Sequence, residues 1–269
     1  MAVRSPLIVA HRGASAHRAE HTRAAYALAL EQGAEGLECD VRLTRDGHLV
    51  CVHDRRVERT STGRGAVSSQ DLATLARHDY GSWHDEFGHA DELITQRVAS
   101  PDPAGSGLLT LADLLGLVTD WPHPVQLFVE TKHPVRYSGL VEAKLVALLA
   151  RYGLASPACR ADSTVLVMSF SACALRRVRA EAPRLPTVAL LGVLGGSRSG
   201  RLPAWADIAG PGVRALRADP EFVHRAAGRG HPTYCWTVDD PDDVALCAAQ
   251  GVSYLATNRP AETRVLLRR

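Results

Sequence analysis

The sequence is poor in aromatic residues and has no long apolar run. Phe, Trp and Tyr together make up 5% of its 269 residues. No apolar stretch approaches the roughly 18 residues that a membrane-spanning helix requires. The apolar stretch at residues 6–10 is also too short for the core of a secretion signal. We therefore predict a protein without a membrane span that works in the cytoplasm.

An excess of charge of either sign is also missing. The chain has 31 Lys and Arg against 29 Asp and Glu, a formal net charge of +2, and its arginines are spread along the sequence. Proteins that bind nucleic acids usually gather basic residues in one patch or stripe, so we expect no nucleic-acid partner. The 46% of hydrophobic residues suffices for a large core.

The six cysteines show neither the close C-x-x-C spacing of a zinc site nor the density of a disulfide-rich domain. We predict reduced, mostly buried thiols. These residues are Cys39, Cys51, Cys159, Cys173, Cys235 and Cys247.

Short apolar or β-branched segments alternate with Ala- and Leu-rich segments about eight times. This alternation predicts a parallel sheet, and eight units predict a closed (β/α)8 TIM barrel formed by one domain, residues 1–269. The alternative, an open doubly wound sheet, usually has a glycine-rich phosphate loop after its first strand, where this chain has His-Arg-Gly. We expect strands at residues 7–10, 36–41, 125–131, 164–169, 187–191, 213–218, 233–238 and 253–257, with a further extended run at 49–53.

One segment interrupts this rhythm. Residues 54–108 are rich in Arg, Thr, Ser, Gly and His and contain only a short helical patch. Long irregular segments inside compact folds usually have a function or are disordered. We interpret this one as a small insertion after the second strand that packs over the mouth of the barrel.

Polar residues gather where the first strands of the predicted barrel end. The carboxyl ends of barrel strands meet at one face, which holds the active site in enzymes with this fold. Residues two apart on a strand also share a face, so Glu38 and Asp40 are expected to point the same way, as are Glu130 and Lys132. The residues expected to converge are His11, Arg12, Glu38, Asp40, His53, Glu130 and Lys132.

Three carboxylates at neighbouring strand ends suit a hard cation such as Mg²⁺ or Ca²⁺. The alternative is a buried salt-bridge network in which Arg12 or Lys132 neutralises the carboxylates. We favour the cation because Glu38, Asp40 and Glu130 together would otherwise leave costly buried charge.

Two histidines lie beside this cluster. His11 and His53 titrate near neutrality, as general acid–base catalysis requires. Arg12 and Lys132 carry the positive charge that binds phosphate oxygens. Together with a divalent cation, these groups indicate phosphoryl transfer.

The motifs HRGASAHRAEHT, GLECDVRLTRDGHLVCVHD and FVETK resemble those of the glycerophosphodiester phosphodiesterase family. The likeness spans the chain, because VLVMSF, YCWTVDD and GVSYLATNRP are similar to the family's later strands. The resemblance implies a metal-dependent TIM-barrel enzyme that hydrolyses glycerophosphodiesters to sn-glycerol 3-phosphate and an alcohol.

The resemblance also implies roles for individual residues. His11 and His53 would be the acid–base pair. Glu38, Asp40 and Glu130 would hold one divalent cation, Mg²⁺ or Ca²⁺, with Mn²⁺ as an alternative. A small phosphodiester substrate would be bound by Arg12, Lys132, Phe170 and Trp236, although core packing is an equal alternative for the two aromatic residues.

Three positions depart from the family pattern. His21 stands where an Asn is usual, and Ser253 and Asn258 stand where Asp residues are usual. We expect His21 to cap the following helix rather than to contact the metal or the substrate. These differences bear on the choice of substrate more than on the reaction.

Two other functions remain as alternatives. A lysophospholipase D-like enzyme acting on lipid headgroups would need an apolar route for an acyl chain, which the low aromatic content disfavours. A non-catalytic barrel that binds phosphate esters would have no need for two proton carriers such as His11 and His53.

Overall fold

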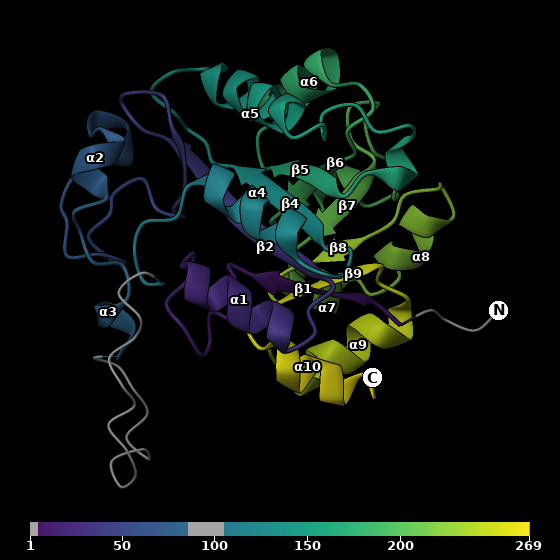
Figure 1. Cartoon of the computed structure of the whole chain (residues 1–269). Helices are drawn as coiled ribbons and strands as arrows, with labels where there is room; N and C mark the ends of the chain where they lie inside the picture. The colour runs from purple at the N-terminus through teal and green to yellow at the C-terminus, as the bar shows by residue number, and fades with distance from the viewer. Residues whose placement is uncertain (1–4, 86–104, 269) are drawn as a thin grey trace, which may run out of the picture.

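The computed structural model describes residues 5–85 and 105–268. Eight parallel strands form a nearly closed barrel with helices on its outside (Figure 1), as the sequence predicts. Neighbouring strands follow the order β7-β6-β5-β4-β2-β1-β9-β8, and parallel bridges from Ala209 to Thr233 and from Gly212 to Trp236 join the two ends. The barrel strands are β1 (Leu7–His11), β2 (Gly36–Leu43), β4 (Gln126–Thr131), β5 (Val165–Ser169), β6 (Thr187–Leu191), β7 (Ile208–Pro211), β8 (Tyr234–Cys235) and β9 (Tyr254–Thr257).

Side-chain caps fix where several helices begin. The Thr22 hydroxyl accepts a hydrogen bond from the Ala25 amide at the first outer helix, and Thr110 forms a capping box with Asp113 at another. The helices around the barrel are α1 (Arg23–Glu31), α4 (Leu111–Asp120), α5 (Leu140–Arg151), α6 (Ala172–Glu181), α7 (Val213–Ala218), α8 (Phe222–Ala227), α9 (Pro241–Gln250) and α10 (Pro260–Leu266).

One predicted strand is wrong. Val213–Ala218 forms helix α7, and the strand at this place in the barrel is β7, immediately before it. A short apolar run does not by its periodicity distinguish a strand from a buried helical turn. Gly210 and Pro211 also give β7 a composition that is unusual for strands, so its sequence was not recognised.

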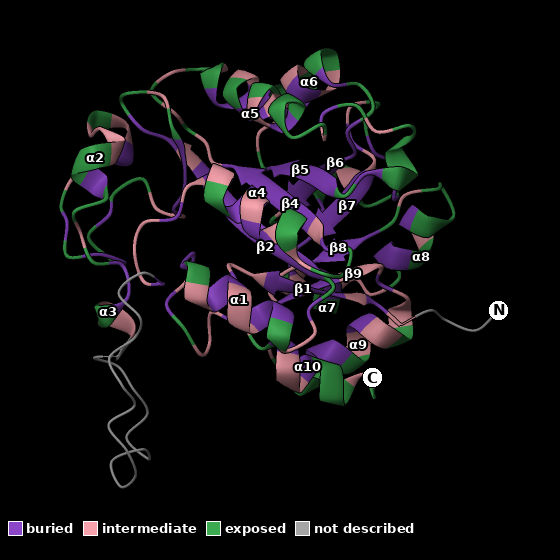
Figure 2. Cartoon of the chain, viewed as in Figure 1, coloured by how far each residue is buried: buried purple, intermediate pink, exposed green. Residues whose placement is uncertain are grey.

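The two faces of the barrel strands pack into different cores. Side chains such as Val9, Phe128 and Met168 fill the barrel interior, whereas Leu37 and Leu127 point outward against the helices. Figure 2 shows the strands almost wholly buried and the helices exposed on their outer surfaces. Since successive strand residues face opposite sides, burial on both sides explains why these strands are almost continuously apolar.

Strand β2 continues past the barrel into a hairpin with β3 (Leu49–Cys51), which runs antiparallel to it. The predicted extended run at residues 49–53 is thus this hairpin strand. The segment that follows contains η1 (Val67–Ser69), α2 (Leu72–Leu75) and α3 (Ser82–Asp85), with α2 and α3 at the left of Figure 1. It has an apolar core of its own around Val57 and Leu75.

Side-chain contacts tie this segment to two loops at the barrel mouth. Arg59 forms an ion pair with Glu20, which precedes α1. The Tyr137 hydroxyl, from the loop after β4, donates a hydrogen bond of 2.9 Å to the Ser68 carbonyl. Our interpretation of residues 54–108 as an insertion over the mouth stays a prediction, and residues 86–104 lie outside the described part.

Two further expectations concern the chain as a whole. No helix in the described ranges is long and apolar enough to cross a bilayer. All six cysteines are free thiols, and four of them are buried, whereas Cys159 and Cys173 are exposed.

Candidate active site

Strand register brings the predicted polar residues together at the carboxyl end of the barrel. His11 on β1 lies opposite Glu38 on β2, and Asp40 on β2 lies opposite Glu130 on β4. A cavity with a volume of about 90 Å³ opens above them. Its lining includes His11, Arg12, Glu38, His53, Glu130, Lys132, Phe170, Tyr234 and Trp236.

The three carboxylates form a compact buried cluster. One oxygen from each of Glu38, Asp40 and Glu130 lies within 4.8 Å of the others. Burial and the charge of Asp40 raise the pKa of Glu130 to about 7 and the pKa of Glu38 well above its usual range. The protein by itself therefore offers too little positive charge to keep all three ionised.

Asp40 is the member of the cluster that the protein does neutralise. Its carboxylate lies 3.1 Å from Arg12 Nε, 3.2 Å from Lys132 Nζ and 2.9 Å from His21 Nε2. Burial alone would raise the pKa of Asp40, but the His21 hydrogen bond and these charges hold it well below its usual range. The salt-bridge network considered as an alternative is thus present around Asp40.

That network does not reach the whole cluster. Lys132 Nζ also lies 2.8 Å from Glu130, so one ammonium group is shared between two carboxylates. Glu38 accepts a hydrogen bond of 3.0 Å from the Arg12 amide, and His11 Nε2 lies 4.0 Å away. The buried Tyr234 hydroxyl has no partner among the described residues, although it lines the same cavity. The carboxylate oxygens of the cluster and this hydroxyl fit a hard divalent cation with its water ligands.

The orientation of His11 is fixed by a chain of hydrogen bonds from β9. The Asn258 amide nitrogen donates to Asp239 at 2.6 Å, which turns the Asn258 carbonyl oxygen toward His11. His11 Nδ1 therefore donates to this oxygen at 2.8 Å, and its Nε2 faces the carboxylate cluster as a free acceptor. Burial and the charge of Arg12 lower the pKa of His11 to about 3 and keep the ring neutral.

His53 lines the same cavity and is about one third exposed. Its Nδ1 donates a hydrogen bond of 2.7 Å to Asp54, which leaves Nε2 for the cavity. Burial and the charges of Arg12 and Lys132 lower the pKa of His53 overall, although Asp40 and Asp54 act in the other direction. Asp54 in turn is paired with Arg59 of the insertion at 2.6 Å.

The expectation that His21 caps a helix is wrong. Thr22 is the cap of α1, while His21 hydrogen-bonds Asp40 through Nε2 and the Tyr26 hydroxyl through Nδ1 at 2.8 Å. Tyr26 donates onward to the Glu38 carbonyl at 3.0 Å. His21 adopts a left-handed φ of 61°, a strained conformation of the kind that clusters at functional sites.

The other noted positions divide between site and scaffold. Phe170 and Trp236 line the cavity with their rings edge to face at 5.3 Å, and Phe170 is 51% exposed. Asn258 touches His11, whereas Ser253 lies before the amino end of β9, at the opposite end of that strand.

Sequence reasoning gave no role to Asp239 or Tyr26. Asp239 follows an apolar strand segment and precedes a second Asp at the start of α9, which is a signal for a strand-end carboxylate. Tyr26 lies on the buried face of α1 and gives no sequence signal, because its hydroxyl meets His21 only in the folded chain.

Comparisons with known proteins identify the family of the chain. A family model described as the glycerophosphoryl diester phosphodiesterase family matches residues 11–262. The probable glycerophosphodiester phosphodiesterase 1 of Mycobacterium tuberculosis (strain ATCC 25618 / H37Rv) is 51% identical over 97% of this chain and 92% of its own length. The glycerophosphodiester phosphodiesterase of Bacillus subtilis (strain 168) is 32% identical over 94% of this chain and 84% of its own.

Solved structures agree on the fold. A phosphodiesterase from Oleispira antarctica, in complex with the product sn-glycerol-3-phosphate, superposes with a TM-score of 0.81 at 22% identity over 98% of both chains. A glycerophosphodiester phosphodiesterase from Agrobacterium tumefaciens gives a TM-score of 0.74 at 25% identity over 97% of this chain and 100% of that one. With its barrel, its strand-end residues and a match over residues 11–262, the chain belongs to the glycerophosphoryl diester phosphodiesterase family.

Proposed function

We propose that this enzyme hydrolyses glycerophosphodiesters to sn-glycerol 3-phosphate and an alcohol with a divalent cation at its carboxylate cluster and two histidines as proton carriers. Its family and its 51% identical relative support the reaction. One observation carries the mechanism: His11 and His53 each present Nε2 to a cavity whose floor is a buried carboxylate cluster.

The phosphodiester is held by the two cations of the site. Arg12 and Lys132 line the cavity and are anchored by Asp40, which orients both side chains toward the same space. Their charge compensates that of the phosphoryl oxygens, which increases as the nucleophile attacks. Arg12 is fixed further by an ion pair of 3.1 Å with Glu20.

The two histidines differ in the direction of proton transfer. His11 is buried and neutral, and its free Nε2 accepts the proton of the attacking hydroxyl, whether this belongs to water or to the substrate's glycerol. His53 is more exposed, and its hydrogen bond to Asp54 favours the protonated form against the lowering effect of burial on its pKa, so we assign the protonation of the leaving alcohol to His53. Asp54 and Asn258 act as positioning residues that fix the two tautomers.

Glu38, Asp40 and Glu130 would hold the cation. When bound, it supplies positive charge beside the phosphoryl oxygens and lowers the pKa of a hydroxyl that it contacts. Mg²⁺, Ca²⁺ and Mn²⁺ all accept such oxygen ligands.

Release of sn-glycerol 3-phosphate from glycerophosphocholine tests the proposal. We expect activity with Mg²⁺, Ca²⁺ or Mn²⁺ and none after treatment with EDTA. Glu38→Gln should lose activity, while the control Glu181→Gln, at an exposed position on α6, should retain it. Full activity of the metal-free enzyme would disprove the cation, and faster hydrolysis of lysophosphatidylcholine would favour the lipid-acting alternative.

A further inference from the structure

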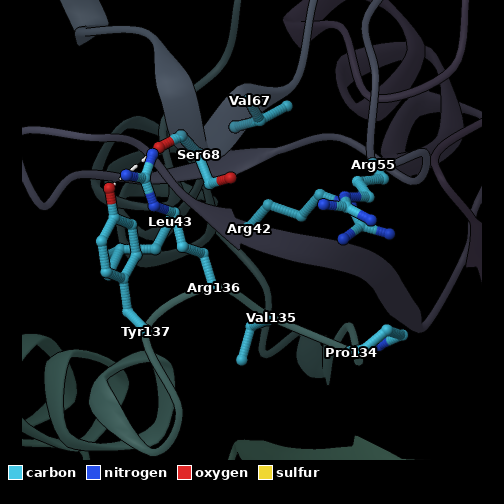
Figure 3. A pocket seen from close by; sticks show the side chains of 9 residues that line it. All are labelled: Arg42, Leu43, Arg55, Val67, Ser68, Pro134, Val135, Arg136 and Tyr137. Carbon is cyan, nitrogen blue, oxygen red and sulfur yellow. Dashed lines mark hydrogen bonds between the residues drawn. The ribbon is translucent and has the colours of Figure 1, made fainter.

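A second cavity lies on the insertion side of the active site and is lined by three arginines (Figure 3). Its lining has no acidic residue among the described side chains and consists of Arg42, Leu43, Arg55, Val67, Ser68, Pro134, Val135, Arg136 and Tyr137. We call it the arginine cavity.

Two guanidinium groups lie next to each other in this cavity. Figure 3 shows Arg42 and Arg55 side by side, with Arg136 on the opposite wall beside Ser68. Two neighbouring cations repel each other, although the exposure of Arg55 to water weakens this repulsion. An oxyanion between the guanidinium groups would relieve it and accept hydrogen bonds from both.

Arginines elsewhere in the same part of the chain have carboxylate partners. Arg45 pairs with Asp71, Arg56 with Glu58 and Arg59 with Asp54. Within the described residues, by contrast, no carboxylate lies within 4.0 Å of any arginine of the cavity. The cavity therefore concentrates positive charge without a directly paired carboxylate among the described residues, although Asp40, Asp54 and Glu130 act on Arg42 from farther away.

The arginine cavity adjoins the catalytic cavity at two places. His53 lines the catalytic cavity, and Arg55, two residues later, lines the arginine cavity. Likewise, Lys132 lines the catalytic cavity and Pro134 lines the arginine cavity. Arg42 also donates hydrogen bonds of 3.0 and 2.8 Å to the His53 carbonyl, which connects the two sites directly.

We propose that the arginine cavity binds a second phosphate group, carried by the alcohol part of the substrate, and so favours glycerophosphodiesters with a phosphorylated leaving alcohol. This assignment rests on the proposed function. Hydrolysis breaks only the bond between the central phosphorus and the alcohol oxygen, which takes up a proton, so the second phosphate leaves intact on the alcohol.

A matched pair of substrates tests the assignment. Glycerophosphoglycerol and its derivative with a terminal phosphate differ only in that group. We expect the derivative to have a kcat/KM about tenfold higher, mostly through KM, since the contact is remote from the reacting bond and resembles one added charge-assisted hydrogen bond. The preference should fall as salt is added, because the arginines are partly exposed.

Arg55→Ala should abolish this preference and leave glycerophosphoglycerol hydrolysis unchanged. Arg55→Lys should retain part of it, because the charge stays and the fork is lost. Arg77→Ala removes the same charge from an exposed position of the insertion outside both cavities and should retain the full preference. Equal melting temperatures of the variants would show that folding is intact.

Inorganic phosphate distinguishes a substrate group from a free ligand. We expect phosphate to inhibit hydrolysis of the phosphorylated diester in the native enzyme more strongly than in Arg55→Ala. Equal kcat/KM for the two diesters would overturn the assignment and leave the proposed function standing. The assignment would also be overturned if phosphate changed the hydrolysis of glycerophosphoglycerol through Arg55 while the enzyme showed no preference between the two diesters. Failure to hydrolyse either diester would overturn both.

Discussion

Replacing Glu130 by Gln tests whether Glu130 belongs to a metal site or only forms a structural salt bridge with Lys132. Glu130 is 7% exposed, and burial together with Asp40 raises its pKa from 4.5 to about 7, against the opposite effect of Lys132. In the metal-free protein, the folded state therefore binds a proton more tightly than the unfolded chain. The contribution of Glu130 to the free energy of unfolding is fully present below pH 4.5 and is lost as the pH rises through about 7.

The magnitude follows from the shift. A change of pKa from 4.5 to about 7 corresponds to about 3 kcal/mol of unfolding free energy. Glu130→Gln keeps the shape of the side chain but does not titrate. Between pH 4.5 and pH 8 in EDTA, the native protein should lose about 3 kcal/mol relative to the variant. Urea unfolding at several pH values measures this difference.

A cation should reverse the effect. At pH 8, a metal concentration about one hundred times the dissociation constant should stabilise the native protein by about 2.7 kcal/mol and the variant far less. At pH 5 the gain should shrink, since Glu130 must lose a proton before it coordinates. A native protein that becomes more stable than Glu130→Gln between pH 4.5 and pH 7 would show that the Lys132 salt bridge dominates, and the reasoning would fail.

Two further predictions concern the histidines and their support. His11→Ala and His53→Ala should each lower kcat by about 100-fold or more, the usual effect of losing a general acid or base, and a near-native rate in steady-state assays would remove that residue from the mechanism. Tyr26→Phe should cost about 1–3 kcal/mol in thermal or urea unfolding, because it leaves His21 Nδ1 and the Glu38 carbonyl without their buried partner. Unchanged stability of Tyr26→Phe would show that these hydrogen bonds contribute nothing measurable.

The candidate site residues could be picked out from the sequence because they follow apolar strands. His11 ends a strand of the buried parallel type, and Glu38 and Asp40 interrupt another with two carboxylates on one face. Polar groups in such positions are costly unless they bind something, so sequence pattern alone marks them. The strand β7 was missed because it is short and ends in Pro211, so packing against its neighbours decides its conformation.

The sequence alone determined the alternation of strands and helices, the barrel that follows from it, and the set of carboxylates, histidines and cations at the strand ends. Only the tertiary structure decided how these groups are paired. In the folded chain His21 hydrogen-bonds Asp40, and Asp239 is connected through Asn258 to His11. Arg42 and Arg55, which form no ion pair with a described carboxylate, line a cavity next to that of His53. The reason is physical: the order of apolar and polar residues is a local property, whereas pairing depends on strand register and loop conformation between residues far apart in the chain.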